Sequence, residues 1–342
     1  MGIVCSYFGK TQNNETVLSF CLRNKSGAYV RILNYGGIIQ SICVPDRDGK
    51  LVDVALGFDT VSEYENDPEY LGKLVGRVAN RIGKSRFTLN GKEYTLTPME
   101  FDNSLHGGVN GYSFRIWDHR IENDKLIFSL YSPDGDEGFP GGLHVTVTYS
   151  FSEDNKLRID YHAAAEADTI VNLTNHVYFN LNGCGDIRNH ILQIAADSYT
   201  EIDDHFMVTG KILPVADSPF DFREPKEIGR DLDYKYEQIK NGLGYDHNFI
   251  LSGGENCVTA RSPQSGITLN LSTDLPGVQF YTGNSLPERK GKGNTTTSRF
   301  SGFCLETLYY PDSPNHPEFP SIVVKKGGEW VHFAEFAFGT DA

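Results

Sequence analysis

Apolar and polar residues alternate along most of the chain, most regularly between Val171 and Leu181. There the odd positions are Val, Leu, Asn, Val, Phe and Leu, and the even positions are Asn, Thr, His, Tyr and Asn. A period of two is typical of a β-strand, because successive side chains leave opposite faces. We therefore predict a half-buried strand whose polar face carries His176 and Tyr178. That face would meet water on an edge strand, or line a pocket for a ligand with many hydroxyl groups.

Shorter alternating runs predict many further strands. The clearest is a hairpin over residues 86–96, in which Asn90 and Gly91 separate two alternating arms. Other expected strands cover 28–35, 38–44, 51–56, 117–121, 125–131, 144–151, 156–163, 190–195, 246–251, 266–273, 278–282, 303–308 and 329–338. Only residues 224–240 are expected to be helical in part. Strands recurring about every ten residues, without a linker or repeat, predict one all-β domain over residues 1–342, a large antiparallel β-sandwich or barrel.

Composition supports the same fold class and excludes two kinds of partner. The chain has 35 Gly, 18 Tyr and 21 Phe, which favours short strands joined by tight turns. Its net charge is −14, from 31 basic and 45 acidic residues, and no run of Lys or Arg occurs. We therefore expect neither nucleic acid nor an anionic membrane surface as a partner.

Cysteine usage and the N-terminus bear on location. Six cysteines stand far apart at positions 5, 21, 43, 184, 257 and 304, without a Cys-x-x-Cys pair, which favours reduced thiols. No stretch resembles a signal peptide or reaches transmembrane length, so a cytoplasmic monomer or weak dimer is expected. Residues 1–6 match the N-myristoylation pattern at Gly2, with Cys5 as a second acylation site. Without a basic patch, we favour a chance match.

Two glycine-rich stretches contain charged side chains that could contact a ligand. Residues 76–83 hold Arg77 and Arg81 beside small residues, so either guanidinium could approach a ligand closely or form an internal salt bridge. In residues 103–108, two glycines follow His106, which would let backbone and imidazole approach a ligand. A structural role for His106 is the alternative.

The other two candidate sites lie on expected strands. His176 and Tyr178 are two residues apart and therefore share a face. Glu306 interrupts the apolar run 303–308, and an unpaired buried carboxylate is costly. Desolvation would raise the pKa of Glu306 toward the range useful to a general base, whereas on an edge strand the side chain would simply face water.

A metal site has little support in the sequence. Residues 134–138, Asp-Gly-Asp-Glu-Gly, lack the full spacing and terminal Glu of a calcium loop, so we interpret them as a turn. The ten histidines show no His-x-x-x-His arrangement on a helix. No metal is expected.

Beyond these patterns, the sequence resembles the aldose 1-epimerases, also called galactose mutarotases, along nearly its whole length. The resemblance is carried, in the family's order, by residues 76–82 (Gly-Arg-Val-Ala-Asn-Arg-Ile), 105–108 (Leu-His-Gly-Gly), 132–141 (Ser-Pro-Asp-Gly-Asp-Glu-Gly-Phe-Pro-Gly), 172–181 (Asn-Leu-Thr-Asn-His-Val-Tyr-Phe-Asn-Leu), 246–249 (Asp-His-Asn-Phe), 276–284 (Pro-Gly-Val-Gln-Phe-Tyr-Thr-Gly-Asn) and 302–307 (Gly-Phe-Cys-Leu-Glu-Thr). It implies a galactose mutarotase-like supersandwich that interconverts the α- and β-anomers of free aldoses such as galactose and glucose, without a cofactor.

The resemblance also implies roles for particular residues. Glu306 would be the general base and His176 the general acid. Further residues implied in substrate binding are Asn80, Arg81, His106, Tyr178, Asp246 and Gln279. The base would take the proton of the anomeric hydroxyl while the acid protonates the ring oxygen. A His176 with a pKa near the ordinary value of ~6.5 would suit this exchange at neutral pH.

Three other functions are weighed against this one. A relative that acts on hexose phosphates would need a basic cluster, and only Arg77 and Arg81 come near one. A non-catalytic sugar-binding protein would not need both Glu306 and His176. A glycosidase would use Glu306 and Asp246 as its two carboxylates.

Overall fold

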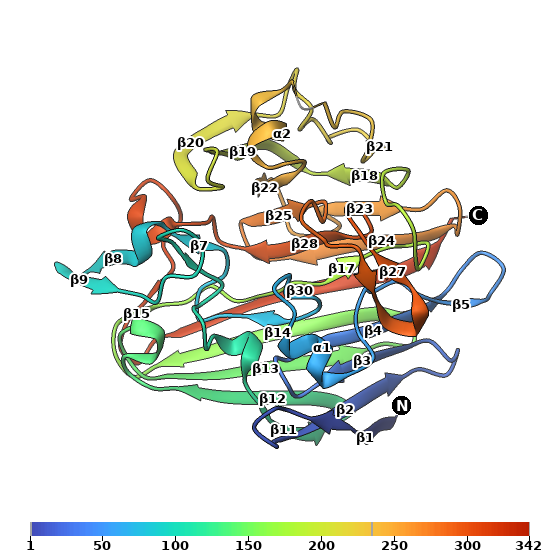
Figure 1. Cartoon of the computed structure of the whole chain (residues 1–342), viewed down its shortest axis with the longest axis horizontal. Helices are drawn as coiled ribbons and strands as arrows, with labels where there is room; N and C mark the ends of the chain where they lie inside the picture. The colour runs from blue at the N-terminus through green and yellow to red at the C-terminus, as the bar shows by residue number, and fades with distance from the viewer. Residues whose placement is uncertain (1, 234, 342) are drawn as a thin grey trace.

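The computed structural model describes residues 2–233 and 235–341, which form a predominantly antiparallel β structure (Figure 1). Within these residues, the largest sheet has the strand order β11 (Asp118–Glu122), β12 (Lys125–Ser132), β13 (Leu143–Phe151), β14 (Lys156–Ala165), β30 (Glu329–Thr340), β24 (Ile267–Thr273), β23 (Val258–Arg261), β18 (Ile191–Ile194) and β21 (Lys226–Glu227). A second sheet has the order β17 (Tyr178–Phe179), β28 (Phe303–Leu308), β25 (Gly277–Tyr281), β22 (Asp246–Leu251), β19 (Ala196–Ile202) and β20 (Val208–Pro214). A third runs β1 (Gly2–Lys10), β2 (Thr16–Arg23), β3 (Tyr29–Leu33), β4 (Ile39–Pro45) and β5 (Leu51–Asp53).

Short strand pairs and single helical turns connect these sheets. The pairs are β6 (Leu74–Val75) with β16 (Thr174–Asn175), β7 (Arg81–Ile82) with β10 (Ser104–Leu105), β8 (Arg86–Leu89) with β9 (Lys92–Thr95), β15 (Thr169–Ile170) with β29 (Val323–Val324), and β26 (Arg289–Lys290) with β27 (Thr296–Thr297). The α-helices are α1 (Val61–Glu65) and α2 (Glu237–Asn241), and 3₁₀ turns lie at Gly83–Ser85, Tyr112–Phe114, Asp136–Gly138, Lys292–Asn294 and Ser313–Asn315. No helix in the described ranges is long and apolar enough to cross a bilayer.

The largest sheet supplies the surface on which the other two pack. Along β13 and β14, buried residues alternate with more exposed ones, so one face of the sheet packs into the core. Phe128 of β12 meets Phe20 of β2 with ring centroids 5.6 Å apart, and Phe336 of β30 meets Phe179 of β17 at 5.2 Å. The predicted antiparallel β-sandwich is therefore confirmed. Figure 1 shows the β8–β9 hairpin projecting at one side and α2 lying with β19 and β20 at the top.

Most strand predictions are confirmed, and two regions differ. The expected strands at 246–251 and 303–308 are β22 and β28, and the hairpin at 86–96 forms as β8 and β9. Within 224–240 the helical part is confined to the start of α2, and β21 is a strand. Among the described strands of four or more residues, β1, β2, β19, β20 and β23 were not predicted, and neither were most of the two-residue strands. In β1 nearly every residue is partly or fully exposed, so its sequence carries no core-facing alternation.

The prediction of one half-buried strand over 171–181 is wrong in its geometry. All residues of this segment are buried on both faces, and the segment crosses from β16, which pairs with β6, to β17, which pairs with β28. The Asn172 side chain donates to the Tyr309 carbonyl at 3.1 Å and accepts from its amide at 3.0 Å, and Asn180 donates to the Ser301 carbonyl at 2.8 Å. Protein groups therefore satisfy these amides, and the polar positions that reach a pocket are His176 and Tyr178.

Candidate active site

A pocket of about 170 Å³ brings most of the sequence-predicted site residues together. Its walls include Asn80, Arg81, His106, His176, Tyr178, Asp246 and Glu306. Also on the walls, and not predicted from the sequence, are Glu69, Tyr70, Glu100, Phe206, Tyr281 and Ser285. Gln279 does not reach the pocket wall: it is buried and donates from Nε2 to Asp246 Oδ1 at 2.7 Å.

Strand register positions the acidic residues of the pocket. Asp246 on β22 is the register partner of Tyr281 on β25, and Glu306 on β28 is the partner of Gln279 on the same β25. The two carboxylates therefore stand on strands that flank a common neighbour. On the other side of β28, Tyr178 pairs with Cys304, which brings the 171–181 segment against the same site.

Glu306 and His176 form a buried carboxyl–imidazole pair. Glu306 Oε1 lies 3.6 Å from His176 Nε2, and their side chains are 2% and 8% exposed. The Cys304 sulfur lies 3.5 Å from His176 Nδ1. Glu306 Oε2 has no hydrogen-bond partner in the described part of the chain. A buried carboxyl oxygen without a protein partner, in a pocket wall beside an imidazole, can act on a bound substrate.

Burial shifts both members of this pair toward their neutral forms. Burial raises the pKa of Glu306 well above its ordinary value, as does the charge of Asp246, while Arg81 acts in the opposite sense. Burial lowers the pKa of His176 to about 3, and the charge of Lys73 adds to this shift. The expectation of an ordinary His176 pKa is therefore wrong, because side chains from distant parts of the chain remove the imidazole from water. Together the two groups favour holding one proton.

His106 is held as a neutral hydrogen-bond donor. Its Nδ1 accepts from the Asn80 amide at 3.2 Å, which leaves the proton on Nε2. Burial lowers its pKa well below the ordinary value, and electrostatic interactions with His176 and Arg81 contribute. The glycine after it serves the fold: a Cβ on Gly107 would lie 2.0 Å from the Gly76 carbonyl oxygen. The expected close approach is therefore to the protein's own backbone.

Arg81 lies in the pocket wall and is bound by a residue that the sequence did not reveal. Its Nε donates to Glu100 Oε2 at 2.5 Å, and NH2 donates to Glu100 Oε1 at 3.1 Å. The ring of Phe206 lies 5.2 Å from the guanidinium carbon. Asn80 supports the same segment, because its side-chain oxygen accepts from the Arg81 amide at 2.8 Å. Burial alone would lower the pKa of Arg81, but the bond to Glu100 and the charge of Asp246 raise it.

Asp246 and Tyr178 complete the wall in different ways. Burial raises the pKa of Asp246, while Arg81 and the Gln279 amide lower it. The Tyr178 hydroxyl donates to the Glu69 carbonyl at 2.9 Å, and its ring lies 5.0 Å from that of His176. Tyr178 therefore offers the pocket an aromatic surface, since its hydroxyl is engaged by the protein.

Arg77, the other arginine of its motif, is a structural residue. It is 1% exposed, and its NH1 donates to the carbonyls of Pro140 and Gly141 at 2.8 Å and to Thr169 Oγ1 at 3.1 Å. Its NH2 donates to Ser132 Oγ at 2.5 Å. The predicted internal salt bridge is not what the structure shows for Arg77, because its hydrogen-bond partners in the described ranges are carbonyl and hydroxyl oxygens. Its role is nevertheless internal.

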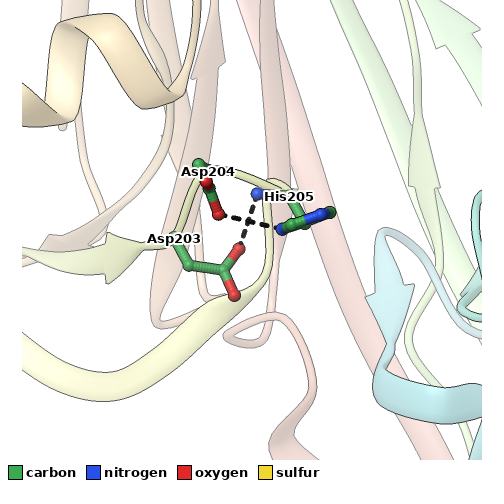
Figure 2. Close-up of side chains that lie close together, drawn as sticks. All are labelled: Asp203, Asp204 and His205. Atoms are coloured by element: carbon green, nitrogen blue, oxygen red, sulfur yellow. Dashed lines mark hydrogen bonds and ion pairs between the residues drawn. The ribbon is translucent and has the colours of Figure 1, made fainter.

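One group of side chains in the described ranges has ligand atoms close enough to share a metal ion: Asp203, Asp204 and His205, on the turn between β19 and β20 (Figure 2). All three are exposed. Asp203 Oδ1 accepts from the amides of His205 and Met207 at 2.9 and 3.0 Å, and Asp204 Oδ1 lies 2.9 Å from His205 Nδ1. These bonds account for the turn. A larger cavity of about 780 Å³ borders it, and its wall carries a second carboxyl–imidazole pair, in which Asp312 Oδ2 lies 3.4 Å from His316 Nε2. This pair is more exposed than Glu306 and His176, with 7% and 18% of the two side chains accessible.

Comparisons with known proteins agree with this geometry. The model of the aldose 1-epimerase family matches residues 19–337. A galactose mutarotase from Rattus norvegicus is 44% identical over 315 residues, 90% of each chain. An aldose 1-epimerase from Escherichia coli strain K12 is 38% identical over 327 residues, 93% of this chain and 94% of that one. A solved aldose epimerase homologue from C. elegans superposes with a TM-score of 0.89 at 31% identity, covering 99% of this chain and all of that one.

On these matches, the protein is an isomerase of the epimerase class. Its β-sandwich has a polar pocket that holds a buried carboxyl–imidazole pair. More narrowly, the chain belongs to the aldose 1-epimerase family.

Proposed function

We propose that the protein is a mutarotase that interconverts the α- and β-anomers of free, uncharged aldohexoses such as galactose and glucose. The observation that carries the proposal is the Glu306–His176 pair, with 3.6 Å between Oε1 and Nε2, in the wall of a small polar pocket. Both the Rattus norvegicus and Escherichia coli relatives bear names of this activity. A protein that only bound sugar would have no need of two proton-transfer groups at this distance.

The proposed reaction uses one proton that Glu306 and His176 share. Glu306 as carboxylate removes the proton of the anomeric hydroxyl, and its electrons form the carbonyl bond. The bond between the anomeric carbon and the ring oxygen breaks, and that oxygen takes a proton from His176. Rotation about the neighbouring carbon–carbon bond presents the other carbonyl face, and closure reverses both transfers. After opening, Glu306 is protonated and His176 is neutral, which is the pair of forms that burial favours.

The remaining residues on the wall are proposed to bind and orient the sugar. His106 offers an Nε2 donor, Asp246 a carboxylate acceptor, and Arg81 the guanidinium hydrogens that Glu100 does not bind. Asn80 and Gln279 support Arg81 and Asp246 through hydrogen bonds, and the ring of Tyr178 packs beside His176. Such fixed donors and acceptors hold a small polar substrate near its reactive geometry.

The charge of the pocket favours an uncharged sugar over a hexose phosphate. Arg81 is the sole Lys or Arg side chain on this wall in the described ranges, and Glu100 already binds it. Acidic side chains at Glu69, Glu100, Asp246 and Glu306 surround it. Juxtaposed like charges cost several kcal/mol, and about 1.4 kcal/mol corresponds to a factor of ten.

Polarimetry tests this preference directly. Freshly dissolved α-D-glucose is expected to approach its equilibrium rotation faster with the protein. For α-D-glucose 6-phosphate, the expected kcat/KM is lower by at least about 10²-fold. Rates without protein are subtracted for each sugar, because phosphorylated sugars also interconvert spontaneously. Equal kcat/KM for both sugars would contradict the proposed substrate class.

The pKa shifts predict the pH dependence of kcat/KM. The active pair holds one proton, so activity is lost at low pH only when His176 takes up a second one. Because the His176 pKa is lowered to about 3, this loss should fall far below the ordinary histidine value of ~6.5. On the alkaline side, the raised pKa of Glu306 moves loss of the last proton upward. We expect a flat profile between about pH 5 and 7, and an inflection near 6.5 would contradict the assignment.

We also infer one domain and a cytoplasmic location. The family match over 19–337, and a largest sheet that joins strands from Asp118–Glu122 to Glu329–Thr340, support one domain. Free thiols at Cys43, Cys257 and Cys304 in the interior support a reducing compartment.

A further inference from the structure

We propose that Glu100 is a positioning residue for catalysis: by binding one edge of the Arg81 guanidinium, it orients the other edge toward the sugar and keeps Arg81 from pairing with Glu306. The inference rests on the proposed function. It adds Glu100 to the residues that act in the pocket, and it states that Glu100 pairs with Arg81 in place of Glu306. It would give Glu100 a role in substrate binding although its main contact is with another side chain.

The contact geometry supports an orienting role. Two bonds, from Nε at 2.5 Å and from NH2 at 3.1 Å, fix the plane of the guanidinium, since the two donors face the two carboxylate oxygens. Arg81 NH1 has no hydrogen-bond partner within the described ranges, and the Arg81 side chain is 11% exposed. Phe206 covers one face of the group. The hydrogens of NH1 and the second hydrogen of NH2 are therefore left for a substrate oxygen.

The fold places Glu100 beside Arg81. β10 pairs with β7 so that Leu105 is the register partner of Arg81, and the turn just before β10 carries Glu100. In that turn the Asn103 amide donates to the Glu100 carbonyl at 2.9 Å, and Asn103 Oδ1 accepts from the Lys84 amide at 2.9 Å. The carboxylate is thus presented by a turn that is joined through Asn103 and β10 to the segment that carries Arg81.

The charges around Arg81 support the second role of Glu100. The groups that face Arg81 are Glu100, Asp246 on β22, Tyr281 on β25, Glu306 on β28 and His106 after β10. Without the Glu100 charge, the positive charge of Arg81 would be balanced by Asp246 and Glu306. Glu306 would then be drawn into an ion pair and become a weaker base. Glu100 therefore keeps the base available for the anomeric hydroxyl.

Steady-state polarimetry on α-D-galactose with Glu100→Gln tests the inference. We expect KM to rise roughly tenfold, kcat to fall because Glu306 becomes a weaker base, and Glu100→Asp, which keeps the charge, to recover part of both losses. The alkaline limb of kcat/KM should move to lower pH, because removing a negative charge near Glu306 lowers its pKa. In an Arg81→Lys background, Glu100→Gln should have little further effect, since its partner is already altered. Urea unfolding confirms that each variant is folded.

Glu93→Gln is the matched control, because Glu93 pairs with Arg86 at 3.9 Å on the exposed β8–β9 hairpin. It should leave KM unchanged. An unchanged KM in both Glu100 variants would overturn the inference, and so would a lower KM, which would mean that Glu100 competes with the sugar for Arg81. Full additivity with Arg81→Lys would do the same. Failure of the proposed function looks different: the wild type would not accelerate mutarotation. Calorimetric titration with galactose, comparing wild type and Glu100→Gln, then still tests the binding role, and equal affinities would overturn it.

Discussion

Replacing Glu306 by Gln should abolish most turnover while leaving sugar binding largely intact. The amide keeps the size of the side chain, but it cannot take the anomeric proton. A single proton transfer contributes about 10²–10⁴-fold in rate, so kcat should fall by that factor. Polarimetry measures the rate, and calorimetric titration with galactose measures the dissociation constant, which should stay within about threefold because Arg81, His106 and Asp246 are unchanged.

Glu329→Gln is the control for this experiment. Glu329 also lies near a histidine, with Oε1 3.4 Å from His162 Nε2, but these side chains are 61% and 43% exposed. Its replacement should leave kcat unchanged. A Glu306→Gln variant that turns over at the wild-type rate would show that Glu306 is not the base, whatever its effect on affinity.

Replacing Arg77 by Met should destabilise the protein strongly without changing the chemistry of the folded molecules. The substitution leaves the carbonyls of Pro140 and Gly141 and the hydroxyl of Ser132 without their charged donor in the interior. A buried hydrogen-bond acceptor that is left unsatisfied costs about 1–3 kcal/mol, and several acceptors lose their donor here. Urea unfolding measures this loss as a lower midpoint.

Activity separates the two arginines of the motif. Arg77→Met should keep the wild-type KM per folded molecule, because Arg77 is absent from the pocket wall. Arg120→Met serves as the control, since Arg120 is 58% exposed beside Glu122 and such pairs contribute about 0–1 kcal/mol. A stable Arg77→Met protein with a raised KM would contradict the structural assignment.

Strands β28 and β22 of the second sheet could be predicted closely, because the polarity of their residues reflects burial within that sheet. Phe303–Leu308 is a mostly apolar run and Asp246–Leu251 ends in one, and both strands were predicted with the observed bounds. The stretch 171–181 shows the limit. Its alternation is real, but Asn172 and Asn180 are buried and satisfied by backbone groups from residues more than a hundred positions away. A pattern of polarity does not distinguish such internal partners from water or a ligand.

The residues of the candidate site were predicted from the resemblance of the sequence to a family. No local pattern in the sequence indicates the pocket residues that were missed. Glu100 precedes a short strand in an irregular turn, and Phe206 lies in the turn between β19 and β20. Each reaches Arg81 only through tertiary structure. The low pKa of His176 likewise depends on burial by segments distant in sequence. The contacts of Glu100 and Phe206 with Arg81 and the low pKa of His176 depend on strand register and burial. Neither can be read from the sequence.

The measurement that tests the account most directly is polarimetry on freshly dissolved α-D-galactose with wild-type protein, against heat-unfolded protein as control. The account predicts that catalytic amounts of folded protein speed the approach to the equilibrium rotation in proportion to protein concentration, without added metal or cofactor. Rotation that changes at the rate of the unfolded control, with galactose and again with glucose, would contradict it.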